Sequence, residues 1–286
     1  MNPSNPHPDT SRPDFGVIIV GDEILSGKRA DKHLTKVIEL LGARGISLAY
    51  ADYVGDSPAR ITQTLKRAFD SCDIVFSCGG IGATPDDHTR QCAAKALNQA
   101  LALHPQAELL IRERMQDVAK EQGVPYEPNR EDNIHRLNMG VFPQSAQIIP
   151  NPYNKIPGFT CVSPGRTLQT GAVHFVPGFP VMAWPMIEWV LDTHYGHLFQ
   201  KSAWLEKSVI VYGAMEAALT PLMETLEAQH PGVKVFSLPS VDHPEHGRHI
   251  ELGVKGDPDK VKAAYPAMLA GLHVFGAKLG PELVRS

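Results

Sequence analysis

Along residues 15–200, short apolar runs alternate with longer segments in which apolar residues recur at helical spacing. The runs have the length and composition of buried strands, and the longer segments have the apolar face of an amphipathic helix. The pattern predicts strands at residues 15–20, 46–54, 73–77, 159–162 and 172–176. It predicts helices at residues 31–42, 57–71, 87–102, 108–122 and 181–192, with an irregular stretch rich in Pro and Asn at 124–157.

Strands that alternate with helices form a parallel sheet covered by helices on both faces. We therefore predict a three-layer α/β fold for residues 15–200. Ligands of such sheets bind at the carboxyl ends of the strands, in the loops that follow them. The glycine-containing loops after Val20, Ser77 and Val176 are predicted to lie at one edge of the sheet.

The pattern changes after Trp204. Strands are predicted at residues 207–212, 233–238 and 248–254, and helices at 215–229 and 258–272. This order, β-α-β-β-α, fits a small α+β module spanning residues 203–283. The first 14 residues are rich in Pro, Asn, Ser and Asp, which predicts a disordered lead-in.

Composition narrows the class of ligand. Hydrophobic residues make up 43% of the chain and charged residues 20%, and the formal net charge is -4 without a long run of Lys or Arg. This argues against nucleic acid as the main ligand, because binding its phosphates needs concentrated positive charge. No stretch approaches the ~20 apolar residues of a membrane span, and the N-terminus lacks a signal-peptide core. We expect no membrane partner and a cytoplasmic location.

The four cysteines, Cys72, Cys78, Cys92 and Cys161, form no C-x-x-C pair and have no zinc-site spacing. Their neighbours are apolar or small, so we predict buried free thiols.

A second group of polar residues surrounds Pro244 and Gly247. The spacing of its histidines suits a metal site on a helix, but Pro and Gly break a helix here. We therefore place the group in a hairpin loop and its following strand, where the side chains need not converge. The group comprises His243, Glu245, His246, His249 and Glu251. The same reasoning covers His194 and His197.

The strongest candidate for chemistry is the segment GGIGATPDDHT at residues 79–89, directly after a predicted strand. Glycines there let the backbone approach an anion, and carboxylates are favoured where a helix begins. The segment lacks the Gly-Lys-Ser/Thr of a Walker loop and is not a G-x-G-x-x-G fingerprint. A tight glycine turn with aspartate caps explains it equally well.

This segment resembles the G-G-[TL]-G-x-x-x-x-D motif of the molybdopterin-binding (MoaB/Mog-like) superfamily. Its Asp-Asp-x-Thr ending is similar to the version in CinA, the competence/damage-inducible protein A family. Four more loops agree in order and spacing, and the resemblance extends from residue 15 to 189. They are Gly21-Asp22-Glu23-Ile24-Leu25-Ser26-Gly27, Val54-Gly55-Asp56-Ser57, the stretch 151–159 and Pro177-Gly178-Phe179-Pro180. Gly213-Ala214-Met215-Glu216 is similar to a segment of CinA's middle domain.

The resemblance implies a MoaB/Mog-like domain and a set of site residues. Two aspartates of the superfamily support metal-assisted chemistry at a phosphoanhydride, and by position they are Asp56 and Asp87. Their carboxylates suit a divalent cofactor ion, Mg, Mn or Co. The implied ligand-binding residues are Gly21, Asp22, Glu23, Ser26, Gly79, Gly80, Gly82, Thr84, Asp86, Thr89, Asn151, Gly158, Pro177 and Gly178. Read without the resemblance, Asp56 is a helix cap and Asp22-Glu23 a solvated loop.

Three functions follow from the resemblance. The first is a metal-dependent pyrophosphatase of the CinA type acting on ADP-ribose or a related dinucleotide such as FAD. The second is a molybdopterin-binding or molybdopterin-adenylylating protein, and the third is a non-catalytic nucleotide-binding protein. The Asp-Asp-x-Thr ending favours the first, because adenylyltransferase-like chains usually have Arg before the second Asp. Related proteins suggest a homo-oligomer with a small nucleotide or pterin ligand.

The sequence departs from the family pattern at three positions. Ala83 replaces a Pro, and Asn154 stands where Gly is usual, in a turn whose left-handed geometry Asn tolerates. Met182 stands where CinA-like chains usually have an acidic residue, which removes a polar ligand contact and favours the third function. We find no counterpart of CinA's amidohydrolase domain, so deamidation of nicotinamide mononucleotide is not expected.

Overall fold

The structure, a computed structural model, describes residues 13–199 and 205–285. It divides into two compact units, Met1–Phe199 and Gln200–Ser286. The predicted lead-in at residues 1–14 lies, except for its last two residues, outside the described part of the chain.

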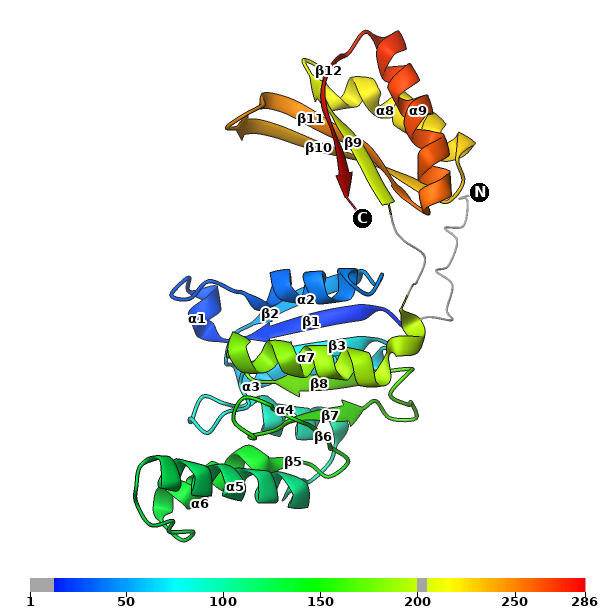
Figure 1. Ribbon diagram of the computed structural model, residues 1–286. Helices are drawn as coiled ribbons and strands as arrows, with labels where there is room; N and C mark the ends of the chain where they lie inside the picture. The colour runs from blue at the N-terminus through cyan, green and yellow to red at the C-terminus, as the bar shows by residue number, and fades with distance from the viewer. Residues whose placement is uncertain (1–12, 200–204, 286) are drawn as a thin grey trace. The chain divides into compact units, whose positions relative to one another are not determined.

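The first unit contains a six-stranded sheet in the order β2-β1-β3-β8-β7-β6 (Figure 1). Its strands are β1 (Phe15–Val20), β2 (Leu48–Val54), β3 (Ile74–Cys78), β6 (Gln147–Ile149), β7 (Gly158–Val162) and β8 (Ala172–Val176). The predicted parallel pairing holds across β2, β1, β3 and β8, but β7 is antiparallel to both β8 and β6. The connection at 163–171 contains no helix, and so short a link cannot return the chain for parallel pairing.

Helices cover both faces of this sheet, which confirms the three-layer prediction. One apolar core lies under α2 (His33–Gly42) and α7 (Pro180–His194). The other contains side chains of α3 (Pro58–Asp70), α4 (Thr89–Leu97) and α5 (Pro105–Glu121). Buried strand residues alternate between the two cores, as the pleat of a strand requires.

Several short elements were not predicted from the sequence. The helix expected at 87–102 begins at Thr89 and ends before Asn98, whose φ of 52° terminates it, and a short strand follows. Most of the other additions lie in the stretch expected to be irregular. They are α1 (Asp22–Leu25), β4 (Leu101–Leu103), α6 (Glu131–Leu137), the 3-10 turns Asn138–Gly140 and Gly196–Leu198, β5 (Val141–Pro143), which pairs with β4, and β6.

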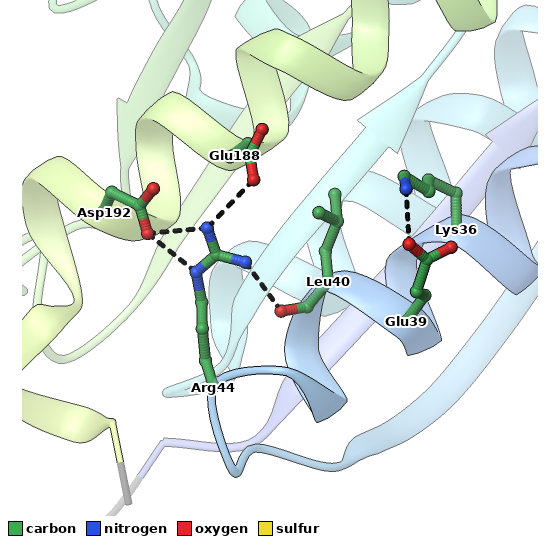
Figure 2. Close-up of polar contacts among 6 residues, drawn as sticks. All are labelled: Lys36, Glu39, Leu40, Arg44, Glu188 and Asp192. Atoms are coloured by element: carbon green, nitrogen blue, oxygen red, sulfur yellow. Dashed lines mark hydrogen bonds and ion pairs between the residues drawn. The ribbon is translucent and has the colours of Figure 1, made fainter. Parts of the chain in front are cut away.

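Arg44 joins α2 to α7 (Figure 2). Its Nε donates to Asp192 Oδ1 at 2.7 Å, its Nη2 lies 3.3 Å from Glu188 Oε1, and its Nη1 donates to the Leu40 carbonyl at 2.9 Å. The Arg44 side chain is only 12% exposed, while both carboxylates remain half exposed. The guanidinium therefore bonds a carbonyl oxygen at the end of α2 and two carboxylates of α7 at one helix–helix contact.

A polar network is enclosed between the sheet and α7. His174 is fully buried; its Nδ1 accepts from Thr160 Oγ1 at 2.8 Å and its Nε2 donates to Tyr195 Oη at 2.7 Å. Tyr195 Oη donates in turn to the Leu168 carbonyl at 2.9 Å. Burial, with repulsion from His194, lowers the pKa of His174 to about 3, so the ring is neutral in the folded protein.

The second unit is an antiparallel sheet in the order β10-β11-β9-β12 with two helices (Figure 1). Its elements are β9 (Leu205–Tyr212), α8 (Glu216–Gln229), β10 (Val233–His243), β11 (Gly247–Gly256), α9 (Pro258–Phe275) and β12 (Lys278–Arg285). The β-α-β-β-α-β order is that of a ferredoxin-like split βαβ fold. The last strand was not predicted, because its Pro and charged residues are typical of an edge strand rather than a central one. None of the helices in the described residues is long and apolar enough to cross a membrane.

The cysteine prediction holds for three of the four positions. Cys78, Cys92 and Cys161 are buried free thiols. Cys72 is exposed, because it lies in the surface turn between α3 and β3. Its small neighbours indicated burial, but a turn between two elements leaves its side chain in solvent.

Candidate functional site

A cavity of about 430 Å³ lies at the carboxyl ends of the parallel strands. Gly21 follows β1, Gly79 follows β3 and Gly178 follows β8, and all three line the cavity. The predicted meeting of these loops at one sheet edge is therefore observed. The predicted site residues in the cavity wall are Gly21, Glu23, Asp56, Gly79, Gly80, Gly82, Thr84, Asp86, Asp87, Asn151, Pro177 and Gly178.

The loop after β1 and the loop after β2 are joined by two reciprocal hydrogen bonds. The Asp22 N–H donates to Asp56 Oδ2 at 2.9 Å, and the Asp56 N–H donates to Asp22 Oδ1 at 3.1 Å. Asp22 does not line the cavity. Its carboxylate accepts from the Asp56 N–H and so holds the Asp56 loop in place. Asp56 does not cap α3, which follows Ser57 without a side-chain cap bond; its Oδ2 accepts instead from the N–H of the first residue of α1.

The glycine loop after β3 is shaped by close backbone approaches. Gly79 has φ 105°, and a Cβ there would collide with the Val20 carbonyl oxygen. Gly80 has φ 70°, and a Cβ there would collide with the hydroxyl of Thr89. Thr89 is fully buried; its Oγ1 donates to the Gly79 carbonyl at 3.1 Å and its N–H to the Gly80 carbonyl at 3.0 Å. Its hydroxyl is thus used to hold the loop, and Thr89 does not line the cavity.

The acidic end of the same loop is fixed from two sides. Thr84 donates to Asp87 Oδ2 from its N–H at 2.9 Å and from its hydroxyl at 2.6 Å. Arg90, only 4% exposed, donates from Nη2 to the Gly82 carbonyl at 2.7 Å and from Nη1 to the Asn138 carbonyl. The sequence predicted Asp86 and Asp87 at the start of a helix. They lie instead in the turn before α4, which begins at Thr89.

Negative charge accumulates in the cavity. Burial raises the pKa of Asp56, and the charges of Asp22, Glu23 and Asp86 raise it further, against the opposing hydrogen bond from the Asp22 N–H. Within residues 13–199 and 205–285, no three His, Cys, Asp or Glu side chains are arranged to hold a metal ion. Mg²⁺ commonly uses one or two carboxylates together with substrate phosphates. The donor set therefore fits an ion whose coordination a phosphate ligand completes.

The loop 151–158 closes another side of the cavity. Asn151 is 4% exposed, and its amide donates to Asn154 Oδ1 at 2.8 Å and to the Ile156 carbonyl at 2.9 Å. The left-handed residue is Lys155, with φ 63°, and not Asn154 as expected. Asn154 instead donates to Met182 Sδ at 3.2 Å, so two departures from the family pattern touch one another.

Residues 16–195 match the sequence model of the family described as "Probable molybdopterin binding domain". This match covers every loop that lines the cavity. The chain belongs to this family. The similarity that the loop motifs predicted is thereby confirmed, and it rests on the first unit.

Relatives agree with the CinA resemblance. A "Putative competence-damage inducible protein" of Clostridium kluyveri is 28% identical over 71% of this chain and 46% of its own length. A protein of Thermoplasma volcanium is 27% identical over 79% of this chain and 80% of its own length. The solved structure of "the protein CinA with unknown function" from Thermoplasma acidophilum gives a TM-score of 0.51 at 27% identity, covering 64% of this chain and 97% of that one. The chain spans about half the length of the Clostridium relative.

Two more of the implied residues lie outside the cavity wall. Ser26 ends α1 and does not line the cavity. Gly158 is buried in β7, where a Cβ would collide with the Phe175 carbonyl, so it permits close strand packing. Arg29 and Phe179 also line the cavity and were among the residues not assigned a role from the sequence. Phe179 lies inside a loop already singled out, between Gly178 and a Pro, and its aromatic character was the available signal.

Three histidines of the second unit, His243, His246 and His249, lie at the β10–β11 hairpin, as predicted. Their rings pack together: the ring centroids of His243, His246 and His249 lie 4.9 to 5.6 Å apart. Tyr212 Oη also lies 3.1 Å from His246 Nδ1. They belong to no arrangement of three ligands among the described residues, so ring packing accounts for the cluster.

Proposed function

We propose that the cavity binds and hydrolyses a phosphoanhydride bond with the help of a divalent metal ion, in ADP-ribose or a related dinucleotide such as FAD. One observation carries the proposal. The carboxylates of Glu23, Asp56, Asp86 and Asp87 share a cavity with the closely packed glycine loop that begins at Gly79. A glycine backbone suits a phosphate, and carboxylates suit the cation that offsets its charge.

Asp56 and Asp87 are the residues expected to hold the ion. Each has one carboxylate oxygen already engaged, Asp56 Oδ2 by Asp22 and Asp87 Oδ2 by Thr84. Their Oδ1 atoms accept no hydrogen bond from the described residues. A bound divalent ion would offset phosphate charge at this point. The role of Asp22 and Thr84 is to keep both carboxylates oriented before the ligand arrives.

Hydrolysis by the purified chain tests the proposal. The substrates are ADP-ribose, FAD, NAD and ATP, each with Mg, Mn or Co, and phosphate-bond cleavage is followed by chromatography. We expect metal-dependent cleavage of one dinucleotide. Asp87→Ala should lower kcat/KM at least about a hundredfold, the usual scale for loss of a transition-state charge contact.

Asp259→Ala is the matched control, since this carboxylate is 92% exposed in the second unit. It should leave cleavage unchanged. If all four substrates stay intact with every metal, the pyrophosphatase proposal is wrong.

The family description favours one second candidate, a molybdopterin-binding or molybdopterin-adenylylating protein. The apolar part of the cavity wall, which includes Ile81, Ile156 and Met182, is compatible with a pterin ring. Binding of a pterin without cleavage of any dinucleotide would favour this candidate. Nucleotide binding without cleavage would favour a non-catalytic protein, in agreement with the Asn154–Met182 contact in the cavity wall.

A further inference from the structure

A second cavity, of about 280 Å³, lies beside the first. The two cavities share five lining residues, which separate them: Val20, Glu23, Arg29, Gly178 and Phe179. The charges on the two sides differ. The second cavity contains Arg29, Lys32 and a single carboxylate, Glu23, whereas four carboxylates line the first. Sites for whole drug-sized ligands occupy about 300–1,000 Å³, so the second cavity suits one part of a ligand.

Phe179 is an exposed aromatic ring on a fixed backbone. Its side chain is 56% exposed although it lies between two cavities. The backbone before it is anchored by the contact of His33 Nε2 with the Gly178 carbonyl at 3.1 Å, and Pro180 begins α7 directly after it. A ring presented in this way has the stiffness and open face that stacking needs.

Arg29 covers this ring without being fixed there. Its guanidinium carbon lies 5.9 Å from the Phe179 ring centroid, and its ion pair with Glu23 is 3.7 Å long. Both partners are about half exposed, so the pair is weak. A ring inserted between the Arg29 guanidinium and the Phe179 ring needs a separation of about 7 Å, twice an ordinary carbon–carbon contact. A small outward movement of Arg29 provides this space and keeps a cation over the inserted ring.

His33 supplies an independent sign of a ligand. It lines the second cavity and is 5% exposed, and its Nδ1 has no hydrogen-bond partner among the described residues. Because Nε2 faces a carbonyl oxygen, the ring proton of the neutral imidazole lies on Nε2 and Nδ1 is an acceptor. A buried acceptor without a partner is rare and calls for a donor that the chain does not provide.

We infer that the second cavity is a ring-binding subsite for an amino-substituted heteroaromatic ring, a purine or a pterin. The ring stacks on Phe179 under Arg29, and its amino group donates to His33 Nδ1. The inference rests on the proposed function in one respect: the phosphates of the same ligand are placed in the first cavity.

Calorimetric binding to the full chain in the presence of Mg²⁺ tests the subsite. The probes are α,β-methylene-ADP, which carries the ring and an uncleavable diphosphate, and methylenediphosphonate, which lacks the ring. Phe179→Ala should weaken α,β-methylene-ADP binding about tenfold, the scale of one base–aromatic stack. Methylenediphosphonate affinity should stay within about twofold, because the carboxylates and the glycine loop of the first cavity are unchanged. Phe179→Trp should keep the wild-type preference for the ring.

Two further variants test whether a changed loop conformation, rather than a lost ring contact, explains the effect of Phe179→Ala. His33→Gln keeps an N–H for the Gly178 carbonyl but lacks the Nδ1 acceptor, and should weaken α,β-methylene-ADP about threefold. Val181→Ala removes a side chain that is 53% exposed next to the site but lines neither cavity, and should change nothing.

The outcomes separate the two proposals. If Phe179→Ala lowers the affinity for both probes equally, or for neither, the ring-binding subsite is overturned. Wild-type binding of methylenediphosphonate with no gain from the ring also overturns it and leaves the proposed function standing. If no diphosphate binds but 6-hydroxymethylpterin binds and depends on Phe179, the pyrophosphatase proposal fails and the subsite stands.

Discussion

In the first unit, β1, β3 and β8 run parallel, and their carboxyl ends bring Gly21, Gly79 and Gly178 to one cavity. In the second unit, neighbouring strands run antiparallel, so successive strand ends lie at opposite edges of the sheet. Polar side chains there pair across the strands instead, as Ser208 and Arg285 do with Glu251. The difference shows why one sheet collects loops into a binding site while the other binds its polar groups internally.

The largest effect is expected when one left-handed glycine is substituted in each unit. Gly79→Ala places a Cβ against the Val20 carbonyl, whereas Gly213, φ 70°, has open space around it. We expect Gly79→Ala to cost about 3 kcal/mol and to abolish phosphate binding, since the loop must move. Gly213→Ala should cost about 1 kcal/mol, the left-handed penalty alone. Urea unfolding and calorimetry measure both, and equal effects would remove the contrast.

The next effect concerns the buried histidine of the first unit. The pKa of His174 is about 3 in the folded protein and about 6.5 when unfolded, so its stabilising contribution is complete above pH 6.5. As pH falls below 6.5 the unfolded chain gains a proton that the folded chain does not bind. We expect the free energy of unfolding of the wild type to fall by about 2 kcal/mol from pH 7 to pH 5 because of this group.

His174→Gln, compared with the wild type by urea unfolding at pH 7 and pH 5, isolates this contribution from the carboxylates. Trp184 and Trp189 on α7 provide a fluorescence signal from the first unit. A variant folded at pH 7 that loses as much stability on acidification as the wild type would contradict the assignment.

The smallest effects compare two arginines. Arg44 is 12% exposed and joins two helices, whereas Arg285 is 53% exposed and pairs with Glu206 and Glu251 at 2.6 and 2.5 Å. Arg44→Ala should destabilise the first unit by about 2 kcal/mol, because a half-buried charge contact is lost. Arg285→Ala should cost the second unit about 1 kcal/mol, because it leaves the carboxylates of Glu206 and Glu251, only 18% and 12% exposed, without their cation, although Ser208 still donates to Glu251.

Salt compares the two arginines further. Around each arginine one partner is about half exposed and the other is mostly buried, so 1 M NaCl should weaken both effects only in part and to a similar extent. Complete loss of one effect with the other unchanged would contradict this comparison.

Much of the first unit could be predicted because its strands are long and apolar and its helices are amphipathic. The short elements could not: β4, β5 and β6 each contain three residues, too few for any period to show. Within the site, the loops were predicted but some of the roles were not. Thr89 and Asp22 had the right chemistry for a ligand, yet their hydrogen bonds hold the Gly79 loop and Asp56.

The sequence by itself determined the α/β alternation, the loops at the carboxyl ends of the parallel strands, and the family to which they belong. Each of these depends on local spacing, which the chain carries in its own residues. Only the tertiary structure decided the reversal of β7, the addition of β12 and the left-handed turn at Lys155. It alone brought Arg29 over Phe179 and buried His174 behind α7. These features depend on which distant segments meet, and pairing across long separations leaves no period in the sequence.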